Sequence, residues 1–455
     1  MKKVLLIAYS FPPHRSSGVY RPAAFAKYLL REGWQPTVLT VTGAPGQEDP
    51  SLLRKIPPEV RIVRTHYPKL RSWEDWLISL VASVTARFAP APPDAASSAA
   101  HSTHHAAARP LRRWAAGLIQ DHLYFPDESA GWVPVALEKA LELHFRERFD
   151  VVYTTHPPRA GHVVGMLLRA LCRVPWLAEF RDPWTLPPSA RPIPEMAVPA
   201  PARNRWLLRR MVGTADAILT VTPGYAEELV SVWGAPASRV QVINNGFDDE
   251  DFSALAANNG RPAWMPPDCV HLAHFGTIYP EFHGSFFPAL VEAVRESEDV
   301  RRRLRVHIIG FPSREVMAYA GREDLREVLQ FHKFLSHSDA LAAMRSSQCL
   351  LLFYGHPYTS QSSIPGKIYE YLRVGRPVFA LAYQGGLREL VEQGNAGWVL
   401  PPDDIPGIKH LLTELASQKL PMPPPPAPEF VSQFRYDHLA KKLAATLDKV
   451  SRRER

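Results

Sequence analysis

The sequence predicts an α/β protein made of two doubly wound domains in tandem. Apolar runs of strand length alternate with segments of helical spacing along most of the chain, which is the pattern of βαβ units and of a parallel sheet. A polar segment rich in Asp, Asn, Gly and Pro, at 246–268, divides this rhythm into two series. The length of 455 residues also exceeds the size at which one hydrophobic core usually keeps growing.

The first series predicts an amino-terminal domain over residues 1–250. The run KVLLIAYS (3–10) has the length of a buried strand, and a helical pattern that ends at Gly33 follows it. Further strands are expected at 36–42, 150–155, 175–180, 216–222 and 239–244, with helices at 159–172, 203–213 and 223–233. Residues 90–109 are of low complexity and predict a mobile inserted loop.

The second series predicts a carboxy-terminal domain over residues 265–428. Its strands are expected at 270–276, 304–310, 328–332, 349–355 and 377–381, with helices at 285–297, 312–320, 337–345 and 366–374. The proline-rich stretch 420–430 predicts extended chain rather than helix. A closing helix within 429–455 is expected to return to the amino-terminal domain.

Composition excludes some classes of protein but leaves the partner open. No apolar run is long enough for a membrane-spanning helix, and we interpret the start, MKKVLLIAYS, as a strand rather than a signal peptide. The three cysteines lie beside apolar residues and form no C-x-x-C pair, which favours buried thiols in a reducing cytoplasm. The net charge of +8 is compatible with nucleic acid, an anionic membrane or anionic substrates.

Three segments combine aromatic and basic residues. A helical stripe within 70–88 includes Trp73 and Trp76, and segment 109–119 contains Arg112, Arg113 and Trp114. Segment 202–212 adds further arginines beside a tryptophan. One interpretation is a surface that lies on anionic lipid. The other is a set of helices packed on the first domain with solvated arginines, since amphipathic helices usually face a core.

Candidate ligand-binding residues follow the predicted strands of the first domain, because ligands of doubly wound folds bind beyond the carboxyl ends of strands. Loop 10–18 lacks the G-x-G-x-x-G fingerprint of dinucleotide sites but offers Arg15 and Gly18 to an anion or a sugar hydroxyl. His156, Arg181 and Asp182 follow two later strands and are candidates for proton transfer or hydroxyl binding. The alternatives are an internal Arg181–Asp182 ion pair and a helix-capping role for His156.

The helix at 366–374 carries the strongest signal. Lys367 lies in its first turn, where the helix macrodipole disfavours a cation unless an anion is bound there. Glu370 lies one turn further on and can accept hydrogen bonds from two hydroxyls, as on a ribose. The alternative is a surface Lys–Glu pair, which stabilises a helix by only a few tenths of a kcal/mol.

Several segments together resemble the retaining glycosyltransferases of family 4. They are SSIPGKIYEYLRVGRPVFA (362–380), NGFDDEDF (245–252), FRDPW (180–184), VTPGYAEEL (221–229) and GLRELVEQGNAGWVLPPDD (386–404). The resemblance implies the GT-B fold, in which two Rossmann-like domains face each other across a cleft. It further implies that the second domain binds a nucleotide-sugar donor and that the first binds the acceptor.

The resemblance also assigns residues to the donor. Glu370 matches the glutamate that holds the nucleotide ribose, and Gly18 matches a glycine near the donor phosphates. The remaining matches are Ile364, Pro365, Gly366 and Gly276 at the diphosphate, and Phe334 and Leu335 at the base.

The sequence departs from the family pattern at two places. Many members have a second glutamate that precedes the ribose-binding one, and here the matching residue is Ser362. The basic residues that usually follow the FG strand are also absent, and Thr277, which stands there instead, is expected to take part in donor binding. Lys367 is therefore expected to replace the missing cation at the diphosphate. The Arg-Asp-Pro-Trp version of the FRDPW motif resembles a bacterial branch associated with cell-surface polysaccharide assembly.

The resemblance implies transfer of a sugar, with retention of configuration, from a nucleotide-sugar to a glycan or lipid-linked acceptor. A UDP-sugar is the favoured donor, and His156, Arg181, Asp182 and Lys367 are the expected catalytic residues. No metal-ligand cluster such as D-x-D is evident between the predicted strands of either domain, so we expect neither a metal nor a cofactor, and no nucleic acid partner. The expected location is the cytoplasm, with peripheral attachment to the inner face of the plasma membrane left open. The alternatives are a nucleotide-sugar epimerase of the same fold and a non-catalytic, membrane-associated assembly partner.

Overall fold

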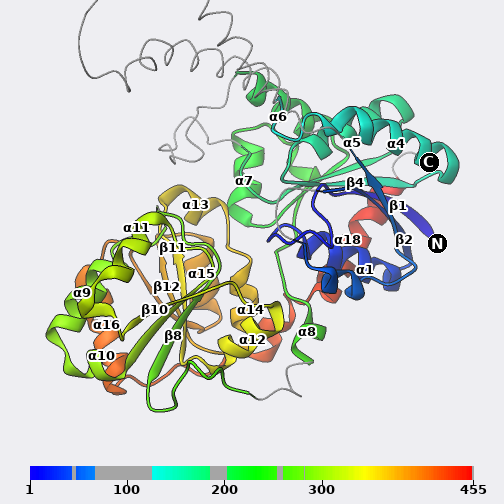
Figure 1. The fold of residues 1–455 in the computed structure, drawn as a ribbon. Helices are drawn as coiled ribbons and strands as arrows, with labels where there is room; N and C mark the ends of the chain where they lie inside the picture. The colour runs from blue at the N-terminus through cyan, green and yellow to red at the C-terminus, as the bar shows by residue number, and fades with distance from the viewer. Residues whose placement is uncertain (44–47, 67–124, 185–201, 254–259, 281, 453–455) are drawn as a thin grey trace, which may run out of the picture.

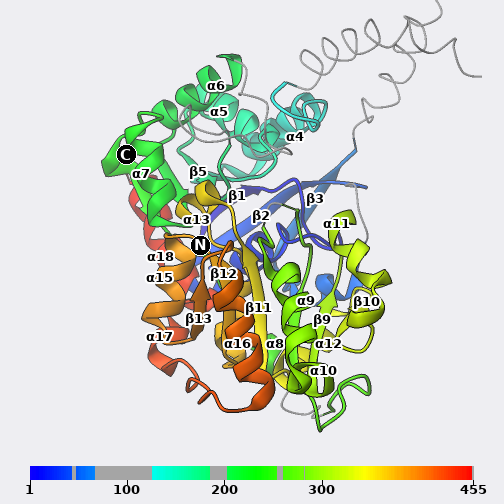
Figure 2. The same ribbon diagram turned by 90° about the vertical axis from the view of Figure 1, so that its left-hand side faces the viewer.

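The computed structural model describes residues 1–43, 48–66, 125–184, 202–253, 260–280 and 282–452. These form two α/β domains that lie one above the other in Figures 1 and 2, with a parallel sheet at the centre of each. The predicted low-complexity loop at 90–109 lies outside the described residues, and so do Trp73, Trp76, Arg112, Arg113 and Trp114.

The amino-terminal domain is built around a seven-stranded sheet in the order β3-β2-β1-β4-β5-β6-β7. Its strands are β1 (Lys2–Ile7), β2 (Trp34–Val41), β3 (Arg61–Thr65), β4 (Val151–His156), β5 (Trp176–Phe180), β6 (Ala217–Thr220) and β7 (Val240–Val242). The pairs are parallel throughout. The strand order reverses between β1 and β4, which is where a doubly wound fold offers a ligand site.

Successive side chains of β1 point to opposite faces of this sheet, so each face has its own core. Leu5 and Ile7 lie in the core under α4 (Trp132–Glu147), α5 (Ala160–Cys172), α6 (Ala202–Thr214) and α7 (Pro223–Ser231). Val4 and Leu6 lie in the other core, under α1 (Tyr20–Leu29) and α18 (Tyr436–Ser451). The last helix of the chain therefore covers the first domain, and Figure 1 shows it in red beside α1.

The carboxy-terminal domain has a six-stranded sheet in the order β10-β9-β8-β11-β12-β13. Its strands are β8 (Val270–Phe275), β9 (Leu304–Ile309), β10 (Leu329–His332), β11 (Cys349–Tyr354), β12 (Val378–Ala382) and β13 (Gly397–Leu400). Its helices are α9 (Phe286–Glu296), α10 (Glu298–Arg303), α11 (Arg314–Met317), α12 (His337–Ser346), α13 (Pro357–Ser362), α14 (Lys367–Val374), α15 (Gly386–Gln393), α16 (Ile405–Ser417) and α17 (Pro428–Ser432). Here the order reverses between β8 and β11.

The predicted fold class is confirmed, and most predicted elements lie within a few residues of their expected bounds. The segment 246–268, predicted as a linker, contains the short helix α8 (Asp249–Ser253). The strands β3 and β13 and the helices α4, α10, α13, α15 and α16 were not predicted. The stretch 420–430, predicted as extended chain, becomes helical at Pro428, where α17 begins. Most side chains of β3 are half-exposed, so this strand lacks the usual alternation of apolar and polar residues along its length. The helix α4 begins at Gly131 without a side-chain cap, so it lacks the usual signal at its start.

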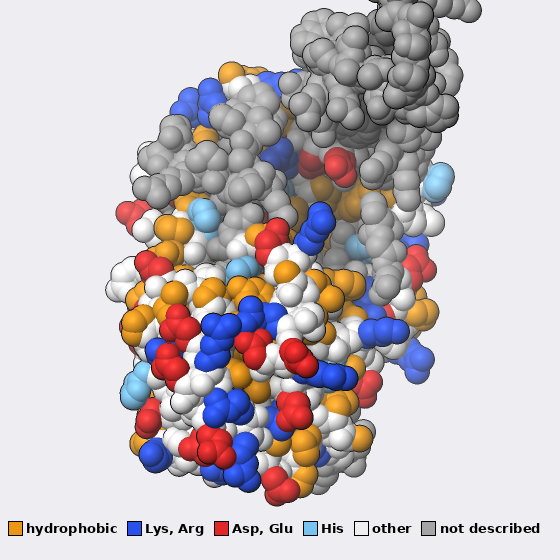
Figure 3. Space-filling view, turned by 60° about the vertical axis from the view of Figure 1, so that its left-hand side comes forward, with side chains coloured by type: hydrophobic (Ala, Val, Ile, Leu, Met, Phe, Trp, Pro, Cys, Tyr) orange, Lys and Arg blue, Asp and Glu red, His pale blue; other side chains and the backbone are white. Residues whose placement is uncertain are grey.

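The face shown in Figure 3 carries interspersed acidic and basic side chains over the carboxy-terminal domain, with no broad field of one sign. Among the described residues, no helix is both long and apolar enough to cross a membrane.

Candidate active site

The loops that follow β1, β4 and β5 meet at the reversal point of the first sheet, and Arg181 holds them together. Its guanidinium is buried and donates hydrogen bonds to the carbonyl oxygens of His156 (2.8 Å) and Gly18 (2.9 Å). A Cβ at Gly18 would lie 3.2 Å from the Arg181 guanidinium, so little space remains beside this glycine. Arg181 thus fixes the position of two other predicted site residues.

His156 ends β4 and is almost wholly buried. Its imidazole stacks on the indole of Trp184, with ring centroids 5.7 Å apart and planes 12° apart. Burial, with the charges of nearby His162, Arg159 and Arg181 in addition, lowers the pKa of His156 well below its usual range. The ring is therefore neutral at physiological pH. Its Nδ1 atom is buried with no hydrogen-bond partner among the described residues.

Asp182 is exposed to solvent at the end of the β5 loop. The surrounding protein still desolvates its carboxyl, which raises the pKa despite the opposing charge of Arg181. In the second domain, the pKa of Tyr354 is raised mainly by burial, and the negative charge of Asp182 raises it further.

Lys367 and Gly276 meet at the reversal point of the second sheet. Gly276 follows β8 with a positive φ of 106°, and a Cβ there would lie 3.2 Å from the Lys367 ammonium nitrogen. The ammonium also lies 3.3 Å from Nε2 of His274, which is buried. Burial lowers the pKa of Lys367 to about 8, although the charge of Glu370 opposes this change. The protein thus holds a desolvated cation, beside an open backbone position, at the start of α14.

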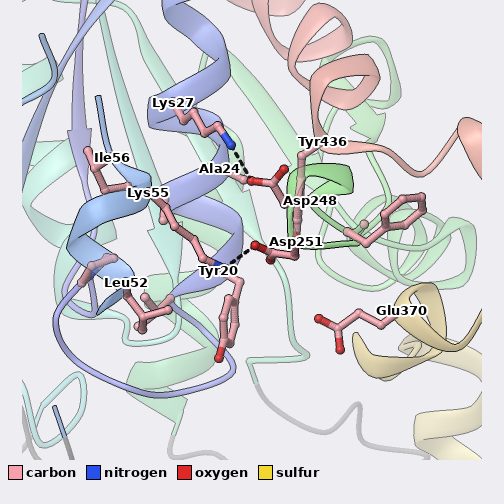
Figure 4. Close-up of a pocket in the computed structure, with 15 residues that line it drawn as sticks. Tyr20, Ala24, Lys27, Leu52, Lys55, Ile56, Asp248, Asp251, Glu370 and Tyr436 are labelled. Atoms are coloured by element: carbon pink, nitrogen blue, oxygen red, sulfur yellow. Dashed lines mark hydrogen bonds and ion pairs between the residues drawn. The ribbon is translucent and has the colours of Figure 1, made fainter. Parts of the chain in front are cut away.

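Glu370 lies one turn further along α14 and lines a pocket between the domains, together with Tyr20, Leu52, Lys55 and Asp251. Figure 4 shows its carboxylate pointing into this pocket from the second domain, opposite Tyr20 of the first. Burial raises the pKa of Glu370 above its usual range, and the charge of His337 counteracts part of this rise.

Arg15 and the predicted base-binding residues form a contact between the domains. The Arg15 guanidinium lies 3.7 Å from the centre of the Phe334 ring and donates a hydrogen bond of 2.8 Å to the carbonyl oxygen of Leu335. The Phe334 ring remains 45% exposed and packs against Phe311, with centroids 5.8 Å apart. Arg15 therefore lies next to the predicted base position rather than beside Lys367.

The loop before α14 runs along the domain boundary. Ile364 is buried, whereas Pro365 is half-buried and Gly366 is exposed. The carbonyl oxygen of Ser362, at the position of the missing family glutamate, accepts a hydrogen bond of 2.7 Å from Thr222 of the first domain. Thr277 is exposed on the loop after Gly276.

The structure brings the predicted residues together in two groups. Gly18, His156 and Arg181 are connected by hydrogen bonds in the first domain, and the Lys367 ammonium lies beside Gly276 in the second. His274 and His337, which contact Lys367 and Glu370 respectively, were not predicted from the sequence as site residues. The position of His274 directly before the strand-ending Phe275-Gly276 was a usable signal, whereas nothing local in the sequence marked His337. Within the described part of the chain, no group of three or more His, Cys, Asp or Glu side chains is placed to hold a metal ion.

Two segments of the chain, one in each domain, match glycosyltransferase family models. Residues 116–251 match the model described as Glycosyltransferase Family 4, and residues 271–418 match the model described as Glycosyl transferases group 1. A D-inositol 3-phosphate glycosyltransferase of Kribbella flavida is 28% identical over 230 residues, which cover 48% of this chain and 53% of that protein. The chain thus spans about half the length of the curated relatives that it matches.

Solved structures of the same architecture cover the whole chain. A glycosyltransferase of Rickettsia africae is similar with a TM-score of 0.60 at 13% identity, over 99% of both chains. Anabaena HepE, in complex with UDP and glucose, is similar with a TM-score of 0.55 at 14% identity, over 100% of this chain and 98% of that one. This likeness concerns the fold, which is the predicted GT-B fold.

Proposed function

We propose that the protein transfers a sugar from a nucleotide-sugar to an acceptor, a proposal supported by the matches of residues 116–251 to the Glycosyltransferase Family 4 model and of residues 271–418 to the Glycosyl transferases group 1 model. The donor we favour is a UDP-sugar, a choice supported by the UDP complex of the structurally similar HepE. The acceptor is a glycan or a lipid-linked glycan, and the transfer retains the anomeric configuration.

The observation that carries the proposal is the position of Lys367. Its ammonium lies 3.3 Å from His274 and next to Gly276, at the amino end of α14. Placing a cation there without an anion is electrostatically unfavourable, because burial and the helix field both oppose the charge. A diphosphate in front of the helix reverses that balance. Glu370 is then within one helical turn, where it can accept hydrogen bonds from ribose hydroxyls.

In the proposed reaction, the bond between the sugar C1 atom and the diphosphate oxygen breaks while the acceptor oxygen attacks C1 from the same face. The acceptor proton passes to a donor phosphate oxygen. Lys367 stabilises the negative charge that grows on the departing UDP, a role that requires no metal. His156 and Asp182 orient the acceptor from the first domain, and Arg181 maintains the loops that bear them.

We place this activity in the assembly of cell-surface polysaccharide or a related glycoconjugate. The support is the Arg-Asp-Pro-Trp sequence at 181–184, which resembles the corresponding bacterial branch.

A thermal-shift assay with UDP, GDP and ADP tests the donor site. UDP is expected to raise the melting temperature by mass action, and Lys367→Gln is expected to remove this rise. Lys419→Gln, at an exposed position after α16, is the matched control and should respond as the wild type does. Absence of a response to all three nucleotides would sink the proposal. Incubation with a panel of nucleotide-sugars, followed by NMR of the anomeric proton, then identifies the sugar and checks retention.

We further propose that the protein works in the cytoplasm and binds peripherally to the inner face of the plasma membrane. Trp206 is 61% exposed on α6, and Arg209 and Arg210 are exposed on the same helix. Such a combination suits the interface of an anionic bilayer. Sedimentation with phosphatidylcholine vesicles containing about one third phosphatidylglycerol should therefore pull down the protein at low salt and release it at high salt.

A triple variant, Trp206→Ser with Arg209→Gln and Arg210→Gln, is expected to lose most of this binding. Arg302→Gln, on an exposed position of α10 in the other domain, should bind as the wild type does. Equal binding of the triple variant and the wild type would assign the membrane contact to another surface or to none.

A further inference from the structure

His337 lies between two carboxylates that come from different parts of the molecule. It is the first residue of α12, and its Nε2 atom lies 3.2 Å from Oδ2 of Asp251 and 3.7 Å from Oε1 of Glu370. Asp251 belongs to α8, in the segment that joins the domains, whereas Glu370 belongs to α14. The imidazole side chain is only 20% exposed.

Residues of the first domain surround the same three groups. Lys55, in the 3₁₀ turn η2 (Pro50–Lys55), forms an ion pair with Oδ1 of Asp251. The ring of Tyr20, from α1, lies against the His337 imidazole with centroids 5.6 Å apart. Figure 4 shows Lys55, Asp251, Tyr20 and Glu370 around one pocket. The titratable groups that face His337 from neighbouring elements are therefore Asp251, Glu370, Lys55 and Tyr20.

The charge state of His337 follows from these neighbours. Burial disfavours the imidazolium, but the hydrogen bond to Asp251 and the charges of Glu370 and Asp251 raise the pKa of His337 above its usual range. Lys55 acts in the opposite direction. The field of the α12 amino terminus also opposes the cation. The two carboxylates therefore account for a cation that helix position and burial both disfavour.

We propose that protonated His337 is a positioning residue of the donor site, which orients the Glu370 carboxylate and keeps it ionised for the hydroxyls of the nucleotide ribose. His337 also connects Glu370 to the amino-terminal domain, because it contacts Asp251, which pairs with Lys55 of that domain. This inference rests on the proposed function and adds a residue, and a pH dependence, to the ribose-binding part of that site.

The expected pH dependence has two limbs. Glu370 can accept hydrogen bonds from both ribose hydroxyls, one on each oxygen, only as a carboxylate, so ribose recognition weakens as the pH falls through its raised pKa. His337 has a raised pKa, so its cation is present below that value and is lost as the pH rises through it. Ribose recognition is therefore greatest between the two pKa values.

The experiment isolates the hydroxyls by comparing two probes. Dissociation constants for UDP and for 2′,3′-dideoxyuridine diphosphate are measured by calorimetry from about pH 5.5 to about pH 8.5, the range in which histidine titrates. The measured quantity is the dissociation constant of the dideoxy analogue divided by that of UDP. Both probes carry the same diphosphate, so the contribution of Lys367 and the titration of the phosphates cancel in this ratio. For the wild type we expect a bell-shaped ratio that reaches about tenfold at its maximum, as for hydrogen bonds to a charged group.

Three variants separate a positioning role from a merely structural one. His337→Gln keeps a polar side chain without a titrating group, so the ratio should fall several-fold and lose its alkaline limb. Asp251→Asn removes a negative charge that raises the pKa values of His337 and Glu370, so the pH at which the ratio is greatest should be lower. Lys55→Gln removes a positive charge that lowers the pKa values of His337 and Glu370, so the pH at which the ratio is greatest should be higher. The control His410→Gln, exposed on α16, should match the wild type.

An alkaline limb that persists in His337→Gln overturns the inference, and so do shifts of the same sign in Asp251→Asn and Lys55→Gln. A wild-type ratio that stays near unity at every pH, with UDP bound, overturns it as well and leaves the glycosyltransferase proposal standing. Failure of the wild type to bind UDP, GDP or ADP at any pH instead removes the proposed function, and the inference with it.

Discussion

At the scale of single residues, the site depends on a lysine whose charge is only weakly favoured. Burial lowers the pKa of Lys367 to about 8, so a measurable fraction of the molecules carries a neutral amine there under mildly alkaline conditions. A bound diphosphate favours the ammonium form and raises this pKa again. Donor binding and protonation of Lys367 are therefore linked.

This linkage predicts proton uptake. At pH 8, close to the pKa of Lys367, binding of UDP should take up about half a proton per molecule from this residue. Calorimetry in two buffers of different ionisation enthalpy measures the uptake. In Lys367→Arg the cation is permanent, so the uptake should drop by that amount while UDP still binds. An unchanged uptake in this variant would show that the proton goes elsewhere.

At the scale of secondary-structure elements, α8 connects the domains through consecutive acidic residues. Asp248, just before the helix, accepts from Lys27 at 2.8 Å and from the Tyr28 hydroxyl at 2.6 Å. Asp249 pairs with Arg373 of α14 at 2.6 Å, and Asp251 lies between Lys55 and His337. A segment that the sequence predicted as a linker is thus held by both domains.

The Asp248 contacts predict a stability difference within this segment. Lys27 and Asp248 are both largely buried, so Asp248→Asn should lower the free energy of unfolding by about 2 kcal/mol, because the buried Lys27 ammonium keeps only the half-exposed carboxylate of Glu250 as a charged partner. Glu250→Gln is the comparison, since Glu250 is 56% exposed and pairs with both Lys27 and Arg31. Asp248 still neutralises Lys27 in that variant, so it should cost less than about 1 kcal/mol. Urea denaturation at neutral pH measures both. Equal losses would contradict this ranking.

Some of the site was predictable at this scale and some was not. Gly276 and Lys367 lie at a strand end and a helix start that flank the same sheet edge, so their proximity follows from the topology. The pairing of His337 with Asp251 depends on how α8 packs between the domains, which no local pattern encodes. The helix α4 buries Trp132, Ala136 and Ala140 on one face, and this spacing was a signal that the sequence analysis overlooked.

At the scale of the whole molecule, the two domains approach each other closely where α7 meets α13. The Thr222 hydroxyl donates to the carbonyl oxygen of Ser362 at 2.7 Å, and the Tyr358 hydroxyl donates to Glu228 at 2.9 Å. Gly224 makes this approach possible, because a Cβ there would collide with the carbonyl oxygen of Gln361.

Gly224→Ala should therefore separate the domains without damaging either one. Alanine is a better helix former than glycine, so α7 itself should remain intact. We expect a larger radius of gyration by small-angle scattering and a loss of sugar transfer of at least about tenfold, with UDP binding largely retained. Gly213→Ala is the control, because a Cβ at Gly213 meets nothing within 4 Å. A variant as compact and active as the wild type would contradict this account.

The return of α18 to the first domain has a consequence for biosynthesis. One face of the first sheet is covered by α18, whose Tyr436 meets Phe25 of α1 with ring centroids 5.8 Å apart. During translation, the strands and α1 leave the ribosome long before α18 does. The apolar face of the first sheet that α18 covers therefore remains exposed to solvent while the second domain is synthesised. The nascent chain therefore needs protection from aggregation over that interval. For the same reason, residues 1–250 expressed alone would lack part of their own core.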